Sequence, residues 1–260
     1  MMDRWRFLDT GAGTGWFNMR LDELLAQRLL RGEGTPVVRV FQWLPWAISL
    51  GHHQNMADID AAHCALDGID VVRRPTGGRA ILHAEELTYS VVMAAGRSGV
   101  LEVYNRISRA LVRGLSLFGV EVSLQKSQPD FTRAYRQASS IPCFTSSARY
   151  EIEHDGRKLV GSAQRRFSDG SRTVVLQHGS ILIGPAHRRL VNYLAIESPE
   201  ALEAIRREME QKTTDLTAIR GSPVDAAELA RAIRKGFEEE WGLTFEDARP
   251  DRTYEVHFTV

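Results

Sequence analysis

The amino-acid sequence predicts an α+β fold in which helices flank a mixed or largely antiparallel sheet and a helical extension forms the C-terminal part. In the first two thirds of the chain, strand-like runs outnumber helical ones. Short turns join most neighbouring strands, as in antiparallel sheets. After Pro185 the spacing of apolar residues becomes helical. We therefore expect one domain over residues 1–260, with the sheet and its helices in 1–185 and a mostly helical extension in 186–260.

The composition supports a folded chain with a substantial core and excludes several classes of protein. Of 260 residues, 43% are hydrophobic and 25% are charged, which is typical of globular domains. Lys and Arg number 33 and Asp and Glu also number 33, so the chain lacks the basic excess of a nonspecific nucleic-acid binder. No apolar run approaches the roughly 18 residues of a membrane span, and no signal-peptide-like stretch follows the N-terminus. We expect a cytoplasmic protein that binds neither nucleic acid nor membranes.

The first half of the chain carries alternating strand and helix signals. Residues 5–9 alternate as a short strand, and apolar residues recur at helical spacing from Phe17 to Leu29. Pro45 separates two further strands. In chain order we expect strands at 37–41 and 46–50, a helix at 58–66, strands at 69–73 and 87–93, a helix at 103–118 and a strand at 120–124.

The second half begins with a segment, 125–142, in which periodicity fails, and loops of this length are often functional. Asp155-Gly156 separates the extended runs 150–154 and 157–160, which is the strongest short-range hairpin signal. The remaining patterns predict a strand pair at 173–177 and 180–183, helices at 187–194, 199–212 and 225–240, and a final strand at 254–260.

Glycine and histidine patterns argue against two common kinds of site. Residues 11–16 resemble a dinucleotide loop, but Trp16 stands at the last glycine position and we expect no βαβ unit after it. His52 and His53 are adjacent, so they would not share a helix face, and the chain's two cysteines cannot form a Cys-based zinc site. We expect no metal and no cofactor.

Two glycine-containing segments are candidates for ligand binding. In residues 72–83, Gly77 and Gly78 let the backbone approach a ligand closely, and arginines on both sides offer planar donors. An ordinary strand–turn–strand with solvated arginines fits the same pattern. In residues 158–164, small side chains at 161–163 indicate that something packs closely on a strand, either a neighbouring element or an elongated apolar ligand. Residues 177–180 have a similar pattern of small side chains. A single histidine in such a segment, here His178, is more often a structural residue than a catalytic one.

The two cysteines have different sequence environments. Cys143 follows Pro142 at the end of the irregular segment, where a thiol is accessible. Lys158 lies two residues beyond the Asp-Gly turn and can project its ammonium toward that loop, which would lower the pKa of the thiol. Cys64 lies on the predicted helix 58–66 and is expected to pack in the core.

Three arginines share one face of the predicted helix 103–118, at i, i+3 and i+7 spacing: Arg106, Arg109 and Arg113. A solvated helix face and a docking surface for an acidic protein partner both fit this pattern.

Several motifs together resemble a known family. They are the opening Trp5-Arg6-Phe7 with Phe17-Asn18-Met19 and Leu21-Asp22-Glu23, Arg73-Arg74-Pro75-Thr76-Gly77-Gly78-Arg79-Ala80-Ile81-Leu82-His83, Leu87-Thr88-Tyr89-Ser90, Cys143-Phe144, Gly156-Arg157-Lys158, Gly161-Ser162-Ala163-Gln164 and Leu176-Gln177-His178-Gly179-Ser180. In this order they resemble the catalytic domain of the biotin/lipoate protein ligase superfamily, and more narrowly its cysteine-dependent octanoyltransferases directed at the glycine cleavage H protein. Arg79 stands where the ligases usually have a third glycine, which favours a transferase over a ligase.

The resemblance implies a catalytic domain with a thioester-forming cysteine. It implies Cys143 and Lys158 as catalytic residues, and as substrate-binding residues Arg74, Thr76, Gly77, Gly78, Arg79, Ala80, His83, Gly161, Ser162, Ala163, His178 and Gly179. The implied donor is octanoyl-acyl carrier protein, and the implied acceptor is a lipoyl-domain protein such as the glycine cleavage H protein. Two alternatives remain open: an ATP-dependent lipoate or biotin ligase, and a relay amidotransferase that moves octanoyl groups between lipoyl domains.

Overall fold

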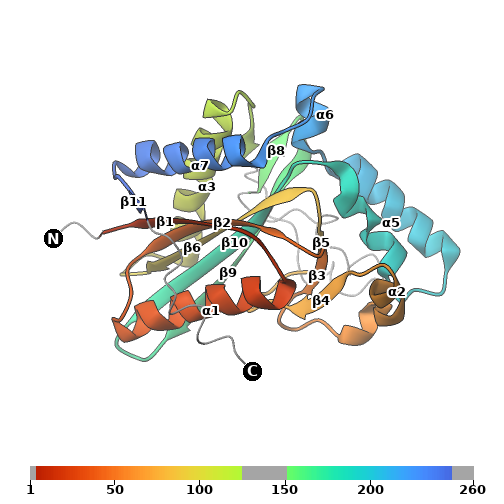
Figure 1. The fold of residues 1–260 in the computed structure, drawn as a ribbon, viewed down its shortest axis with the longest axis horizontal. Helices are drawn as coiled ribbons and strands as arrows, with labels where there is room; N and C mark the ends of the chain where they lie inside the picture. The colour runs from red at the N-terminus through yellow and green to blue at the C-terminus, as the bar shows by residue number, and fades with distance from the viewer. Residues whose placement is uncertain (1–3, 125–150, 248–260) are drawn as a thin grey trace.

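A computed structural model describes residues 4–124 and 151–247 of the chain. Cys143, the irregular segment predicted at 125–142 and the strand predicted at 254–260 lie outside the described residues. Within the described part, the structure confirms the α+β class, with one large mixed sheet, a smaller second sheet and flanking helices (Figure 1).

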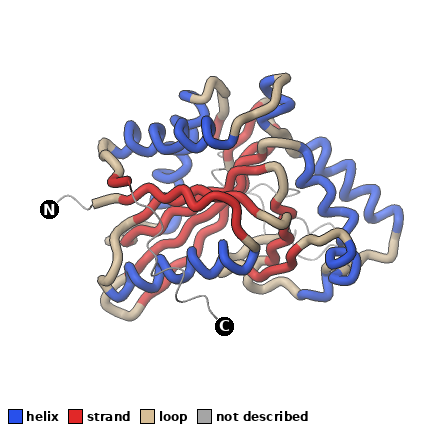
Figure 2. The backbone as a smooth tube through the Cα atoms, viewed as in Figure 1, coloured by secondary structure: helices blue, strands red, loops and turns tan. Residues whose placement is uncertain are grey.

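The large sheet has the strand order β11–β1–β2–β6–β10–β9–β8–β7, and the small sheet has the order β4–β3–β5 (Figure 2). The large sheet contains β1 (Arg6–Gly13), β2 (Val37–Trp43), β6 (Glu86–Ala94), β7 (Ser123–Leu124), β8 (Ile152–His154), β9 (Arg157–Ser168), β10 (Thr173–Leu182) and β11 (Glu246–Asp247). The small sheet contains β3 (Ala47–Leu50), β4 (Asp70–Arg73) and β5 (Ile81–His83).

Helices cover both faces of the large sheet. They are α1 (Gly15–Arg31), α2 (Ala61–Leu66), α3 (Val100–Leu117), α5 (Pro199–Lys212), α6 (Leu216–Arg220) and α7 (Ala226–Trp241), with 3-10 segments η1 (Met56–Asp58) and η4 (Pro185–Tyr193). In Figure 1, α1 lies on one side of the large sheet, α3 and α7 lie together on the other, and α2 and α5 lie beside the small sheet. None of the helices in 4–124 and 151–247 has the length and apolar character needed to cross a bilayer.

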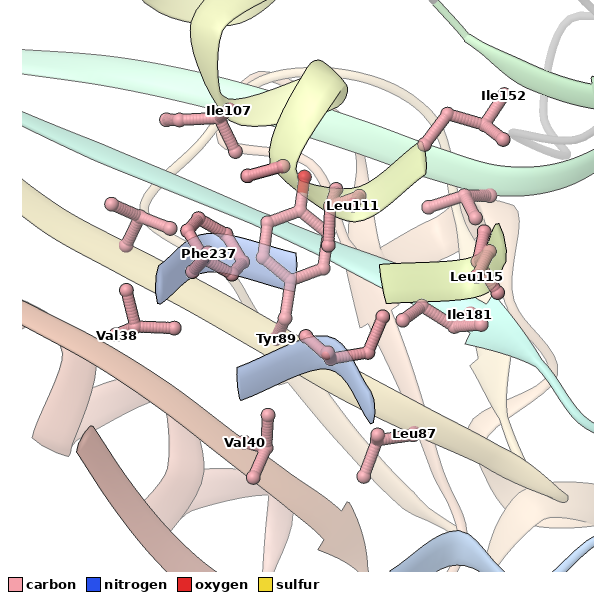
Figure 3. Close-up of a cluster of buried hydrophobic side chains, with 14 of the residues drawn as sticks. Val38, Val40, Leu87, Tyr89, Ile107, Leu111, Leu115, Ile152, Ile181 and Phe237 are labelled. Carbon is pink, nitrogen blue, oxygen red and sulfur yellow. The ribbon is translucent and has the colours of Figure 1, made fainter. Parts of the chain in front are cut away.

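The strands of the large sheet contribute to a separate apolar cluster on each face. Neighbouring residues of one strand point to opposite faces, so Val37 joins the cluster of α1 while Val38 joins the cluster of α3 and α7. Figure 3 shows the second cluster, in which Val38, Val40 and Tyr89 of the sheet lie on the side of Leu111 and Phe237. Burial on both faces explains why these strands read as nearly continuous apolar runs.

The first three elements form a βαβ unit, and this corrects one expectation. Strand β1 pairs with β2 in parallel, and α1 connects them. Thr14 caps α1 by accepting a hydrogen bond from the Phe17 backbone N–H, and Gly32 ends the helix with a left-handed φ of 75°. Our expectation that no βαβ unit follows residues 11–16 is therefore wrong. Strong helix periodicity was visible in the sequence, whereas the parallel pairing of its flanking strands was not.

The structure also corrects the strand pair predicted at 173–177 and 180–183. These residues form one continuous strand, β10, which pairs with β9 and β6 on its two sides. His178 and Gly179 suggested a turn, but Gly179 serves close packing between strands. A Cβ added there would lie 2.3 Å from the carbonyl oxygen of Gly161, so only glycine lets the strands meet at this position.

Other predicted elements hold with adjusted bounds. The Asp155-Gly156 hairpin joins β8 and β9, with φ of 48° and 72° at the two turn residues, and this confirms the turn prediction. The helices predicted at 199–212 and 225–240 are α5 and α7. The helix predicted at 187–194 is the 3-10 segment η4, and the strand predicted at 120–124 shortens to β7.

The arginine face of α3 packs against α7. Arg109 pairs with Glu240 at 2.8 Å and Arg113 pairs with Glu239 at 2.7 Å. The Arg106 guanidinium lies 4.6 Å from the centre of the Trp241 ring. The three arginines remain exposed, which agrees with the solvated-face interpretation, and they also contact a helix of the same chain.

Candidate functional site

A cavity lies between the large sheet and the small sheet, on the large-sheet face that α1 covers. It comprises about 430 Å³ of space between atoms, part of which opens to solvent, and its exposed lining is mostly apolar. The lining residues come from elements far apart in the sequence. They are Met19, Trp43, Arg74, Gly78, Ile81, His83, Thr88, Gly161, Ser162, Ala163, His178, Gly179 and Ser180.

Two rows of residues, paired strand to strand, cross the large sheet at this cavity, and Thr88 together with the row members on β9 and β10 forms the cavity floor. One row runs across β2, β6, β10 and β9 as Arg39, Ser90, His178 and Ala163. The next row runs as Phe41, Thr88, Ser180 and Gly161. On β9 both rows end in a small residue, which leaves space above that strand. The floor therefore combines polar groups over β6 and β10 with an open apolar region over β9.

The residues 74–79, here named the glycine turn, contribute Arg74 and Gly78 to the lining. Arg74 is buried and donates hydrogen bonds to the carbonyl oxygens of Gly77 and Arg79 at 2.9 and 2.7 Å. Gly78 has a φ of 96°, which favours glycine. A Cβ added to Gly51 would lie 2.0 Å from the carbonyl oxygen of Gly78. The turn is thus held rigidly from within and packed closely against the chain after β3.

A first buried histidine, His178, is held between a carboxylate and a hydroxyl; we name this group the Asp22 relay. Asp22 Oδ2 accepts from His178 Nδ1 at 3.1 Å, and His178 Nε2 contacts Thr76 Oγ1 at 2.6 Å. The other carboxylate oxygen accepts from Arg39 Nη1 and Ser90 Oγ, each at 2.8 Å. Burial raises the pKa of Asp22, but the charge of Arg39 and these hydrogen bonds outweigh burial and lower that pKa. Burial lowers the pKa of His178 against the opposing effect of Asp22, which favours the neutral ring.

A second buried histidine, His83, has a similar arrangement, named here the Glu86 relay. Glu86 Oε1 is within hydrogen-bond distance of three groups: His83 Nδ1 at 2.8 Å, Thr88 Oγ1 at 2.6 Å and Ser180 Oγ at 2.8 Å. His83 Nε2 contacts Ser49 Oγ at 2.7 Å. The other oxygen, Glu86 Oε2, is buried and has no hydrogen-bond partner among the described residues. The His83 ring stacks on Trp43 with 3.9 Å between ring centres.

Both relays end on groups that hold the glycine turn. Thr76, the last member of the Asp22 relay, belongs to the turn itself. Ser49, the last member of the Glu86 relay, accepts a hydrogen bond from Arg74 Nη1 at 3.1 Å. Each histidine therefore connects a buried carboxyl group to the glycine turn through hydrogen bonds. In this way the carboxyl groups help to fix the position of the turn that covers the cavity.

Lys158 lies on β9, three residues before Gly161, and is 4% exposed. Its ammonium forms an ion pair with Glu151, which is also buried. Burial raises the pKa of the nearby Glu153, and the charge of Lys158 opposes this effect. The backbone of Lys158 is fixed as well, since its carbonyl oxygen accepts from the Thr214 N–H at 3.0 Å. A buried cation is thus held on β9, the strand whose residues 161–163 line the cavity.

The structure gathers most of the predicted substrate-binding residues around one cavity. Those that line it are Arg74, Gly78, His83, Gly161, Ser162, Ala163, His178 and Gly179. The others lie behind the lining: Thr76 contacts His178, Gly77 and Arg79 offer carbonyl oxygens to Arg74, and Ala80 is buried in the core beside the small sheet. Ligand binding by these residues stays a prediction, as does the role of Cys143.

Sequence reasoning missed part of the site. Met19, Trp43, Ile81, Thr88 and Ser180 also line the cavity, and Asp22 and Glu86 hold its histidines. One signal was available: Thr88 and Ser90 alternate with apolar residues in a strand that otherwise reads as fully buried. Buried hydroxyls at period two need partners, which indicates a polar network on that face.

Cys64 and the histidine pair have the environments of structural residues. Cys64 is 1% exposed, and burial together with Asp60 and Asp67 raises the pKa of its thiol to about 11, which confirms the prediction of core packing. His52 and His53 meet edge to face at 4.8 Å. Among residues 4–124 and 151–247, no group of three or more His, Cys, Asp or Glu side chains is arranged to hold a metal ion.

The chain matches one known family and several curated relatives over most of its length. Residues 14–238 match the lipoyl protein ligase A/B catalytic domain. The octanoyltransferase LipM of Symbiobacterium thermophilum is 40% identical over 249 residues, which cover 94% of this chain and 89% of the relative. LipM of Kyrpidia tusciae is 38% identical over 250 residues, which cover 94% of this chain and 90% of the relative.

Solved structures share the fold at lower sequence identity. One is a structure of a bi-partite lipoate protein ligase and its E2 lipoyl domain from Thermoplasma acidophilum, with a TM-score of 0.76, 17% identity, and coverage of 98% of this chain and 90% of that one. Another is a lipoate-protein ligase A bound with ATP, with a TM-score of 0.75, 20% identity, and coverage of 98% and 92%.

Proposed function

This chain belongs to the family of lipoyl protein ligase A/B catalytic domains, and we propose that it moves an octanoyl group from octanoyl-acyl carrier protein to a lysine of a lipoyl domain. The relatives support octanoyl transfer in lipoate biosynthesis, so the chain is an octanoyltransferase. The proposal adds the donor, the covalent route through Cys143 and an acceptor such as the glycine cleavage H protein. The observation that carries it is the apolar cavity over β9, on the strand that holds Lys158.

In the first step the thiolate of Cys143 attacks the carbonyl carbon of the donor thioester. A carbon–sulfur bond forms to Cys143, and the bond to the carrier's sulfur breaks. The Lys158 ammonium gives its proton to the departing carrier thiolate, which leaves as a thiol. One thioester replaces another, so the exchange is close to thermoneutral and requires no ATP.

In the second step the neutral amine of a lipoyl-domain lysine attacks the octanoyl-enzyme thioester. An amide bond forms, the bond to Cys143 breaks, and the Cys143 thiolate is regenerated. The proton lost by the attacking nitrogen returns to Lys158, which restores its ammonium form. His83 is the weaker candidate for this role, because both of its ring nitrogens already contact Ser49 and Glu86.

The ion pair between Lys158 and Glu151 supports a proton-transfer role for the lysine. A carboxylate beside an ammonium favours its charged form, so the neutral Lys158 formed in the first step readily takes up the proton released in the second. The backbone amides of Gly77 and Gly78 are candidate donors to the tetrahedral oxyanion. The apolar cavity holds the octanoyl chain, and each buried methylene contributes about 0.8 kcal/mol to binding.

Intact-protein mass spectrometry without ATP tests the covalent route. After incubation with octanoyl-acyl carrier protein, we expect the mass to increase by one octanoyl group that hydroxylamine removes. Cys143→Ala should not be acylated, whereas the matched control Cys64→Ala should be, because Cys64 is buried in the core. Acyl transfer that requires ATP and survives in Cys143→Ala contradicts the proposal and assigns ligase chemistry.

Two variants of Lys158 separate the effect of its charge from its role in proton transfer. Lys158→Arg keeps a cation but transfers no proton near neutral pH, so we expect it to retain more self-acylation than Lys158→Met while both lose transfer to the lipoyl domain. Equal loss of self-acylation in both variants contradicts a role for the positive charge of Lys158 in forming the thioester.

A comparison of two donors identifies the source of the octanoyl group. Faster acylation by an octanoylated H protein than by octanoyl-acyl carrier protein identifies a relay amidotransferase instead.

A further inference from the structure

We propose that Met19 is the end wall of the acyl cavity and sets the length of the acyl chain that the enzyme accepts. This inference rests on the proposed function, because it takes the cavity as the acyl-binding site. It assigns a specificity role to a residue of α1 to which the sequence analysis gave no site role.

The geometry places Met19 at the end of the cavity away from β9, the strand that carries Lys158. The cavity crosses four neighbouring strands, from Gly161 on β9 to Trp43 on β2. Strands lie about 4.8 Å apart, so these two strands are about 14 Å from each other. Lys158 lies on the β9 side. Met19 packs with Trp43 and Phe41 on the β2 side, so an acyl carbonyl near Lys158 directs the methyl end of the chain toward Met19.

A second hollow lies directly behind Met19. This outer groove runs between α1 and β4 and comprises about 670 Å³ of space that includes open solvent. Met19 is the residue that lines both the cavity and the outer groove. The other groove residues are Trp16, Arg20, Glu23, Val71, Val72 and Arg73. One side chain, 6% exposed, therefore separates the cavity from a solvent-open groove.

The surroundings of Met19 make it the adjustable part of this wall. Trp43 is held by stacking on His83 and by donating a hydrogen bond to Thr88 at 2.7 Å. Methionine is unbranched and fills irregular gaps, and Val72 packs against its cluster from the groove side. Truncating Met19 should therefore join the two hollows, with Val71 and Val72 as apolar surface for additional methylenes.

The test is a donor series with octanoyl-, decanoyl- and dodecanoyl-acyl carrier protein and a lipoyl-domain acceptor. We expect Met19→Ala to raise the ratio of kcat/KM for the dodecanoyl donor over the octanoyl donor at least about tenfold, since a single methylene in an apolar pocket is worth this much. The volume-matched control Met19→Leu should keep the wild-type ratio. A ratio measured in one preparation is independent of the fraction of folded protein.

A second variant tests the direction in which the longer chain extends. Val72→Asp, added to Met19→Ala, places a charge in the outer groove. We expect this double variant to lose the increase in kcat/KM for the dodecanoyl donor. Its kcat/KM for the octanoyl donor should stay equal to that of Met19→Ala. An unchanged ratio in Met19→Ala overturns the inference. Inactivity of the wild-type protein with every acyl-acyl carrier protein defeats the proposed function instead, so the two failures are distinguishable.

Discussion

The Asp22 relay and the Glu86 relay use the same parts but balance charge differently. In both, a carboxyl group holds Nδ1 of a buried histidine and a hydroxyl meets Nε2. Asp22 forms a buried ion pair with Arg39. For Glu86, by contrast, the ion-pair partner among the described residues is His83 itself, and one carboxyl oxygen has no hydrogen-bond partner there.

This difference in charge balance indicates different roles for the two relays. The Asp22 relay is fully bonded and fixes α1, the sheet and the glycine turn relative to one another. Both histidines line the cavity, but the Glu86 relay is less completely bonded and its histidine stacks on Trp43 of the cavity wall. We infer that the first mainly stabilises the fold and that the second mainly positions the cavity wall. The predictions below separate these roles, from the largest expected effect to the smallest.

Breaking the ion pair of the Asp22 relay should cause the largest loss of stability. Asp22→Asn leaves the guanidinium of Arg39 buried without its counter-charge, and such changes cost about 3–5 kcal/mol. Urea denaturation should show this loss as a lower midpoint. In the double variant Asp22→Asn/Arg39→Met the charge itself is gone, so the loss should be smaller than the sum of the single variants. Additive losses contradict a coupled pair.

Acid should destabilise the protein through its buried neutral histidines. Burial lowers the pKa of His178, and it lowers the pKa of His187 to about 3. Because the folded-state values lie below the unfolded value of about 6.5, the unfolded chain binds more protons as pH falls below 6.5. The stability contribution is therefore complete above that pH and decreases by about 1.4 kcal/mol per pH unit and histidine below it.

Denaturation curves between pH 7 and pH 4 measure this dependence. For His187 the decrease should continue down to about pH 3. His187→Gln and His178→Gln should each show a shallower decrease than the wild-type protein, whatever their stability at pH 7. A slope that neither variant reduces assigns the acid sensitivity to other groups.

Glu86→Gln should cost less stability than Asp22→Asn, because the ion-pair partner of Glu86 among the described residues is His83 and not a buried arginine. The glutamine oxygen keeps the acceptor for Thr88 and Ser180, so we expect a change of about 1 kcal/mol. Transfer should suffer more than folding, with a lower kcat/KM, because Glu86 fixes the orientation and the tautomer of the His83 ring through Nδ1. Wild-type kinetics of Glu86→Gln would contradict the role of Glu86 in positioning His83.

Removing an exposed ion pair far from the cavity should have the smallest effect. Arg109→Ala loses the pair with Glu240, in which Arg109 is 61% exposed, and exposed pairs contribute about 0–1 kcal/mol. Thermal denaturation and donor KM should stay close to wild type. A large increase in donor KM for Arg109→Glu, with an unchanged midpoint of denaturation, would restore the docking interpretation of this helix face.

Local signals in the sequence determined much of the secondary structure. The periodicity of α1, the helices predicted at 199–212 and 225–240 and the Asp155-Gly156 hairpin all appear in the structure within a few residues. These features depend on short-range physics: helix spacing, capping hydrogen bonds and positive φ at turns. The glycine turn and the small residues 161–163 could also be recognised as candidates, because small side chains mark close approach.

Only the tertiary structure decided which residues meet. The parallel pairing of β1 with β2, the single strand β10 and the packing of the α3 arginines on α7 depend on contacts between distant segments. The same holds for the two relays, since Asp22 lies 156 residues from His178. The sequence assigned Met19 no role in the site, and its place between two hollows follows from the crossing of α1 over β2 and β4. The chemistry of a side chain follows from its own atoms, whereas the fold determines which groups surround it and change its charge and hydrogen bonding.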